Sequence, residues 1–173
     1  MSLHDHLSGP KTATTMRIIP RRAAIAAALA LAACGFAPVY GPGGAGTKLH
    51  GQVRIAEPVT QDDYAFLRRL TERLGPDESA RYALSYQLRI AVVPQAITPD
   101  EVTTRYSLNG TAAFSLTETA SGRVVTQGEV SNFSSHSAVG SVITTVSAEQ
   151  DARNRLAVML ADQVMTRLLA ATP

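Results

Sequence analysis

Cys34 is the only cysteine among the 173 residues, and its neighbours suggest a specific chemistry. It follows Leu31, Ala32 and Ala33 at the end of an uncharged apolar run that begins at Ala23. This order resembles a bacterial lipobox, in which the cysteine thiol takes a diacylglyceryl group, the chain is cleaved before the cysteine, and the new amine is acylated. A buried structural cysteine after an apolar helix is the alternative. We predict the lipid, because leader, small residues and cysteine stand in the required order.

The segment before Cys34 has the organisation of a secretory signal peptide. Arg17, Arg21 and Arg22 precede the apolar run of residues 23–33. As a helix this run rises only about 16 Å, too short for a hydrocarbon core of ~30 Å. We therefore predict a cleaved signal peptide over residues 1–33, with Met16 as a candidate for the true start. Gly35, rather than an Asp, follows the cysteine and favours sorting to the outer membrane.

The histidines, which could take part in catalysis, have no catalytic partner in a recognisable motif. His50 and His136 are the only histidines after Cys34, and no motif links them to a serine or a carboxylate, so both are interpreted as surface side chains. No metal-ligand, phosphate-loop or nucleophile motif is present in the sequence. We predict a protein that is not an enzyme and that has no metal and no cofactor apart from the covalent lipid.

Three arginines are candidates for anion binding. Arg89, Arg105 and Arg123 fall on the polar side of predicted strands or at a strand start, and guanidinium groups recognise phosphate through paired hydrogen bonds. A solvated sheet face with scattered cations is the alternative. Overall charge gives no further support: the whole chain has a net charge of +2, but without residues 1–33 it becomes −1. Aromatic residues make up 5% and Trp is absent, which argues against nucleic acid as a partner.

The remaining pattern predicts the elements that position these residues. Residues 34–48 are rich in Gly and Pro, and we interpret them as a lipidated tether, although Gly41, Gly43 and Gly46 spell G-x-G-x-x-G. A strand is expected from Leu49 to Ile55. A helix should follow, capped by Thr60 with Asp63 and ended by Gly75-Pro76. Its expected core-facing stripe is Tyr64, Leu67, Leu70 and Leu74.

Two long alternating runs predict a hairpin. Folding it about residue 98, with a loop over 94–102, pairs Tyr82 with Phe114, Tyr86 with Gly110 and Arg89 with Ser107, diagonal to Arg105. After a turn at Ser121-Gly122, a fourth strand is expected over residues 123–135, bulged near Gly128. Its expected apolar residues are Val124, Val125, Val130 and Phe133.

A capping box of Ser147 and Gln150 predicts a final helix that runs to about Ala170. Its expected core stripe is Leu156, Met159, Leu160, Val164 and Leu168. The order β-α-β-β-β-α predicts a single α+β domain over residues 49–171. We expect a two-layer sandwich in which a four-stranded, mostly antiparallel sheet carries two helices on one face.

The start of the predicted mature chain resembles a known family. Residues 34–41 read Cys-Gly-Phe-Ala-Pro-Val-Tyr-Gly, similar to the opening of the lipopolysaccharide-assembly lipoprotein family LptE, in which Leu is common where Val39 stands. Further similarity lies in Thr104-Arg105-Tyr106-x-Leu108 and in the last helix from Ala152 to Leu168. The resemblance implies the same β-α-β-β-β-α sandwich and no enzymatic activity.

The resemblance also implies a role. A member of this family would plug the lumen of the LptD-type β-barrel on the periplasmic side of the outer membrane and help lipopolysaccharide reach the outer leaflet. Lipopolysaccharide carries phosphates, so Arg89, Arg105 and Arg123 become candidate contacts through their charge. Two alternatives remain: a different outer-membrane assembly or pilot lipoprotein, and a periplasmic lipid-modifying enzyme, which would need a partner for His50 or His136.

Overall fold

The computed structural model describes residues 39–97 and 103–172, which belong to one compact unit of the chain. The predicted signal peptide, Cys34 and residues 35–38 of the predicted tether lie outside the described residues. Within the described residues the elements follow one another as α2 (Ala45–Leu49), β1 (Val53–Ile55), α3 (Gln61–Leu74), β2 (Tyr82–Ile97), β3 (Thr103–Glu118), β4 (Val124–Ser137) and α4 (Val142–Ala171).

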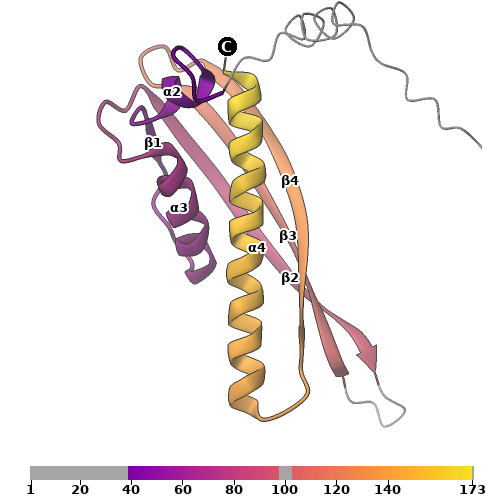
Figure 1. Cartoon of the computed structure of the whole chain (residues 1–173). Coiled ribbons are helices and arrows are strands. Elements are labelled where there is room, and N and C mark those ends of the chain that lie inside the picture. Colours follow the sequence, from indigo (N-terminus) through magenta and orange to yellow (C-terminus); the bar gives the residue numbers. More distant parts are fainter. Residues whose placement is uncertain (1–38, 98–102, 173) are drawn as a thin grey trace, which may run out of the picture. The chain divides into compact units, whose positions relative to one another are not determined.

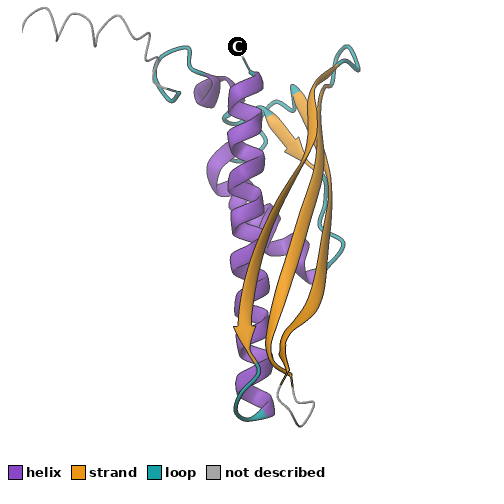
Figure 2. Ribbon diagram, turned by 90° about the vertical axis from the view of Figure 1, so that its right-hand side faces the viewer, coloured by secondary structure: helices purple, strands orange, loops and turns teal. Residues whose placement is uncertain are grey.

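The strands form one four-stranded sheet in the order β1-β2-β3-β4, and α3 and α4 cover one of its faces (Figures 1 and 2). β2, β3 and β4 are antiparallel neighbours, whereas β1 pairs in parallel with the start of β2. A parallel pair needs a crossover, and α3 supplies it. The predicted α+β class and two-layer arrangement agree with the structure, but the sheet is mixed rather than mostly antiparallel.

The predicted strand from Leu49 is wrong at its start. Leu49 ends the short helix α2, which buries Gly46 and Leu49, and only Val53–Ile55 is extended. Gly51 has φ +69°, a left-handed conformation that interrupts an extended chain. Gly46 packs so closely on the Tyr40 ring that a Cβ there would lie 2.5 Å from it. The last residues of the segment predicted as a tether are therefore packed against the domain.

The predicted hairpin has the correct faces but the wrong register. Tyr86 pairs with Phe114 and Arg89 with Thr111, so from Tyr82 to Pro94 the partners in β3 lie four positions later than predicted. A shift by an even number keeps inward side chains inward. The cause is that β2 continues to Ile97 through part of the predicted 94–102 loop. Pro94 is tolerated because β1 covers only Tyr82–Leu84, which leaves the rest of β2 at the sheet edge.

β4 differs from its prediction in the place of its irregularity. The register shift lies opposite Leu116 and Thr117, where Val125 is the extra residue, and not at Gly128. Gly128 instead pairs with Phe114, whose ring lies beside it at ordinary van der Waals distance from where a Cβ would be. Of the apolar residues expected in this strand, Val130 is inward and buried, whereas Phe133 is 69% exposed.

The helices confirm one predicted cap and correct another. Thr60 and Asp63 form the predicted capping box of α3, but Tyr64 is 63% exposed and Phe66 takes its place in the core. α4 begins at Val142, with the Ser141 side chain as its cap, rather than at Ser147. The buried side chains of α4 are Ala152, Leu156, Ala157, Leu160, Ala161, Val164, Met165 and Leu168.

Candidate functional site

The domain has two ends that differ in composition. The proximal end carries Val39, α2 and the last turn of α4, and the distal end carries the first turns of α4 and the adjoining ends of β2, β3 and β4 (Figure 1). Val39 belongs to the proximal end because its carbonyl accepts a hydrogen bond of 2.9 Å from the Gly46 amide. Cys34, the predicted lipidation residue, precedes Val39 by five residues.

The three arginines predicted as one anion site are spread over the sheet. Arg89 lies in the middle of β2 opposite Thr111 and bonds the Gln87 side chain at 3.0 Å. Arg105 lies near the distal end of β3, opposite Ser137 in β4. Arg123 precedes β4 at the proximal end. Strand rise separates Arg105 from that end by about 40 Å, so the three do not form a single site, and the predicted proximity of Arg89 to Arg105 is wrong.

One face of the sheet has no helix over it in the described part of the chain (Figure 2). We call it the open face. Its side chains are the outward-facing residues of β2, β3 and β4, mostly Ser, Thr, Gln and Asn. Among the described residues its charged members are Arg89, Arg105 and Glu129. The face is therefore strongly polar and almost uncharged.

A hollow of about 560 Å³ lies around Arg105 on the distal part of this face. It combines one guanidinium group with several hydroxyl groups and two exposed apolar side chains, Phe133 and Val139, each 69% exposed. Its lining is Gln95, Thr104, Arg105, Ser107, Phe133, Ser135, Ser137 and Val139. Such a mixture of cation, hydroxyls and apolar surface suits an anionic amphiphile.

Four apolar side chains at the distal end are exposed to solvent. Val139 is 69%, Val142 80%, Ile143 78% and Val146 60% exposed. We call these four residues the distal cluster. Exposed apolar side chains that lie close together make this end a candidate interaction surface.

The proximal end carries a basic hollow of about 440 Å³. Arg81 and Arg123 both approach the Glu118 carboxylate, at 3.7 and 3.5 Å, and Lys48 also lines the hollow. The hydrogen bond from Ser121 and the positive charges of Arg123 and Arg81 lower the pKa of the Glu118 carboxyl below its ordinary value, although partial burial acts in the opposite direction. Glu118 is therefore an ionised carboxylate between two guanidinium groups.

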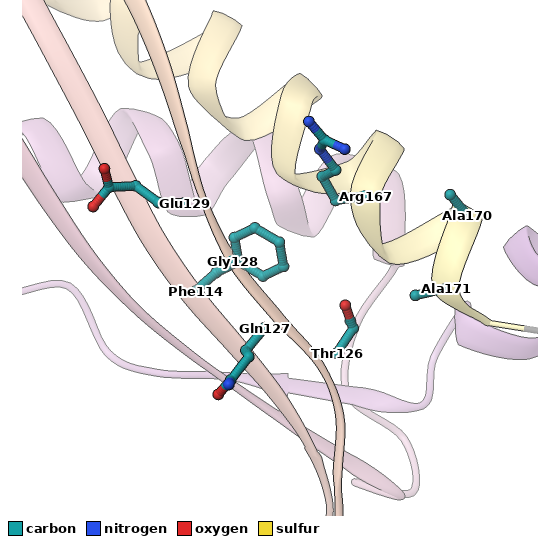
Figure 3. A pocket seen from close by; sticks show the side chains of 8 residues that line it. All are labelled: Phe114, Thr126, Gln127, Gly128, Glu129, Arg167, Ala170 and Ala171. Atoms are coloured by element: carbon teal, nitrogen blue, oxygen red, sulfur yellow. The ribbon is translucent and has the colours of Figure 1, made fainter.

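A third hollow, of about 310 Å³, lies between β4 and the end of α4. Figure 3 shows the Phe114 ring against β4 at Gly128, with Arg167 on α4 and Glu129 on the opposite side of the strand. None of its lining residues is a nucleophile hydrogen-bonded to a base, so its geometry has no catalytic arrangement that we recognise.

The two histidines have different surroundings. His50 is exposed as predicted, and its ring packs over Gly75. His136 is only 7% exposed, which corrects the prediction of a surface side chain. Its ring stacks on Tyr106 with centroids 5.5 Å apart, and its buried Nδ1 has no hydrogen-bond partner among the described residues.

Within residues 39–97 and 103–172, no cluster of metal-binding side chains occurs and no helix is long and apolar enough to span a membrane.

Comparison with known proteins identifies the family. The model of the LptE family, described as lipopolysaccharide-assembly, matches residues 51–168 of the 173. The chain belongs to the LptE lipopolysaccharide-assembly family. LptE is a family of non-enzymatic lipoproteins of the cell envelope. A search of curated proteins finds no match.

Solved structures share the LptE-family fold of this chain. One is described as a lipoprotein from Caulobacter crescentus CB15, with TM-score 0.59 and 18% identity over 73% of this chain and 93% of the other. The rare lipoprotein B from Shewanella oneidensis has TM-score 0.53 and 8% identity over 69% and 92%. Lipoprotein B from Nitrosomonas europaea has TM-score 0.52 and 11% identity over 68% and 81%. At these identities the similarity establishes a common fold.

Sequence reasoning missed two surfaces of this LptE-family chain. The distal cluster was missed because the final helix was expected to begin at Ser147, although the apolar residues before it were a visible signal. The basic hollow was missed because Lys48 fell in the predicted tether and Arg81 in the loop before β2. Only the fold brings Lys48, Arg81 and Arg123 together.

Proposed function

We propose that this chain is an outer-membrane lipoprotein that seats in the lumen of an LptD-type β-barrel and helps lipopolysaccharide reach the outer leaflet. Its anchor is an N-acyl diacylglyceryl group on Cys34, which holds the domain on the periplasmic side. Several acyl chains anchor stably where a single chain binds only marginally. Membership of the LptE family supports the role in lipopolysaccharide assembly.

The observation that carries the barrel proposal is the open face of the sheet. Barrel lumens are polar, and a polar face without net hydrophobicity is compatible with such a lumen. The strands β2 and β3 have 16 residues each, which corresponds to about 50 Å and exceeds the ~30 Å hydrocarbon core. A domain of this length can fill a lumen through the whole thickness of the membrane. The distal cluster supplies the apolar contact that such seating needs.

The hollow around Arg105 supports direct contact with lipopolysaccharide. The guanidinium group suits a lipid A phosphate, and Phe133 and Val139 suit acyl chains. Arg89 lies on the same face, about 20 Å further along the sheet, and provides a second cation.

We expect Arg89→Glu with Arg105→Glu to weaken lipopolysaccharide binding and to reduce its salt dependence. Unchanged binding would leave both as solvated surface residues. Arg68→Glu, an exposed position on α3, is the matched control.

The barrel proposal is tested by mass spectrometry of what co-purifies with the chain from native membranes in detergent. A large β-barrel protein is the expected partner. Secretin or efflux subunits in its place would favour a pilot lipoprotein, and recovery of no barrel would contradict the proposal.

The same spectra test the anchor, because Cys34 should carry the mass of three acyl chains. Cys34→Ala should release the chain from the membrane fraction unless barrel contacts retain it.

A further inference from the structure

Arg81 and Arg123 converge on one carboxylate and leave a positive charge uncompensated. Their guanidinium groups lie 3.7 and 3.5 Å from the two oxygens of Glu118. The arginine side chains are 62% and 69% exposed, whereas that of Glu118 is 20% exposed. One carboxylate neutralises one of the two guanidinium groups, so the three side chains together keep a net charge of +1. Most of the N–H donors of the arginine pair face outward. The side not occupied by Glu118 is open to an anion.

Other groups fix and extend this arrangement. The Arg81 guanidinium lies 5.3 Å from the centroid of the Tyr82 ring, which holds it through a cation–π contact. Ser121 donates a hydrogen bond of 2.8 Å to Glu118 and so fixes the carboxylate between the two arginines. Lys48 of α2 lines the same hollow, which brings a third cation to this surface.

The hollow lies at the end of the domain that a lipid on Cys34 would hold to a bilayer. Five residues of sequence separate Cys34 from Val39, and a fully extended chain of that length spans about 18 Å. The Val39 carbonyl is bonded to Gly46 in α2, and Lys48 follows two residues later in the same helix. The chain therefore has too little length to move this basic surface far from the headgroup layer.

We propose that Lys48, Arg81 and Arg123 bind the phosphates of anionic phospholipids in the leaflet that holds the Cys34 lipid. This inference rests on the proposed lipidation of Cys34. Guanidinium groups bind phosphate through paired hydrogen bonds, and basic residues beside a lipid anchor add to its membrane affinity. The contact fixes the proximal end on the membrane surface, in addition to the tether. It also separates the role of Arg123 from that of Arg89 and Arg105.

Hydrogen exchange on the lipidated chain in nanodiscs tests this contact. Discs of neutral phosphatidylcholine are compared with discs that also contain phosphatidylglycerol. We expect the amides of residues 119–123 to exchange more slowly in the anionic discs, and this protection to fall at high salt. Because each basic residue near an anionic surface contributes about fivefold, Arg81→Gln with Arg123→Gln should weaken the contact by about 25-fold.

The control is Arg68→Gln with Arg155→Gln, which removes two exposed, ion-paired arginines outside the hollow and should leave the protection unchanged. Equal exchange in neutral and anionic discs, or full protection in the Arg81 and Arg123 variant, would overturn the inference. Protection by lipopolysaccharide in neutral discs without protection by phosphatidylglycerol would also overturn it. A chain that fails to enter either disc contradicts the proposed anchor instead. The Arg81 and Arg123 variant should still recover the barrel partner.

Discussion

The two parts of α4 contain similar aliphatic side chains in opposite surroundings. From Ala152 onward, residues such as Leu160 and Leu168 are completely buried. In the first turns, Val142 and Ile143 are 80% and 78% exposed. Burial of a large aliphatic side chain stabilises a fold by about 1.5–3 kcal/mol, and the distal residues gain none of this in the isolated domain. The difference indicates that the proximal part of α4 stabilises the fold, and it agrees with the proposal that the distal part contacts a partner.

The largest expected effect tests the buried half of this comparison. Leu168→Ala should lower the free energy of unfolding by about 2–5 kcal/mol, because it leaves a cavity where the side chain is fully buried. Ile143→Ala, in the same helix, should change it by less than about 0.5 kcal/mol. Urea unfolding of both variants measures the difference. Equal losses would show that the two parts of α4 contribute equally to stability.

Gly110 tests how closely α4 packs on the sheet. A Cβ there would lie 2.9 Å from Leu160 and 3.0 Å from Leu156, which are completely buried and can shift only by displacing their neighbours. Gly110→Ala should therefore destabilise the domain by about 1–3 kcal/mol in urea unfolding. Gly128→Ala is the matched control, since its Cβ would meet the Phe114 ring at an ordinary 3.5 Å. A Gly110 variant as stable as the control would mean that the helix is not in close contact with β3.

Within the described residues, the hydroxyl of Tyr86 is an unpaired polar group at the contact between α3 and the sheet. The Tyr86 ring packs on Phe66 with centroids 4.9 Å apart, and its buried hydroxyl has no hydrogen-bond partner among the described residues. Tyr86→Phe should stabilise the domain by about 1 kcal/mol, because it removes an unpaired polar group. A loss of stability of that size at neutral pH would indicate that the hydroxyl has a partner in solution.

The pH dependence gives an independent check of Tyr86. Burial, together with the negative charge of Asp63, raises the pKa of Tyr86 to about 12. The unfolded chain ionises this group first, near pH 10, so the folded state loses stability as the pH rises from 10 to 12. The stability curve of Tyr86→Phe should fall less steeply than that of the natural chain in this window. Parallel curves would mean that Tyr86 titrates normally.

The smallest expected effect on stability is at the distal cluster. Val142→Ser, Ile143→Ser and Val146→Ser should each change the unfolding free energy by less than about 0.5 kcal/mol, because these side chains are exposed. The triple variant should nevertheless lose the co-purifying barrel. A stable triple variant that retains the barrel would assign the contact to another surface.

Much of the fold could be predicted from local signals. The Thr60 capping box, the stop at Gly75 and the inward faces of β2 and β3 follow from residue types and period, and the structure confirms them. The register of the β2–β3 hairpin could not be predicted in the same way. An even shift leaves every side chain on the same face of the sheet, so the face pattern does not fix the register, and only the true strand length does. The start of α4 was misplaced because Ser147 offers a plausible cap within the helix, whereas the cap in the structure is Ser141.

The functional surfaces were less predictable than the fold. Arg105 was selected for its charge, and the hollow around it also requires Phe133. Phe133 faces outward because it lies three positions after the inward Val130 in a regular part of β4. Arg81 and Arg123 are separated in sequence. They meet at Glu118 because the pairing of β2 with β3 brings in Arg81 and the turn between β3 and β4 brings in Arg123. Such surfaces depend on tertiary placement, which residue spacing does not encode.

The most direct test of the central claim is photo-crosslinking in intact cells with a reactive amino acid at Ile143 in the distal cluster. Ala120, an exposed residue in the turn between β3 and β4 at the proximal end, is the comparison site. The proposed seating predicts a crosslink from position 143 to a large β-barrel protein and none to that protein from position 120. A barrel crosslink from position 120 alone, or from neither position, would contradict it.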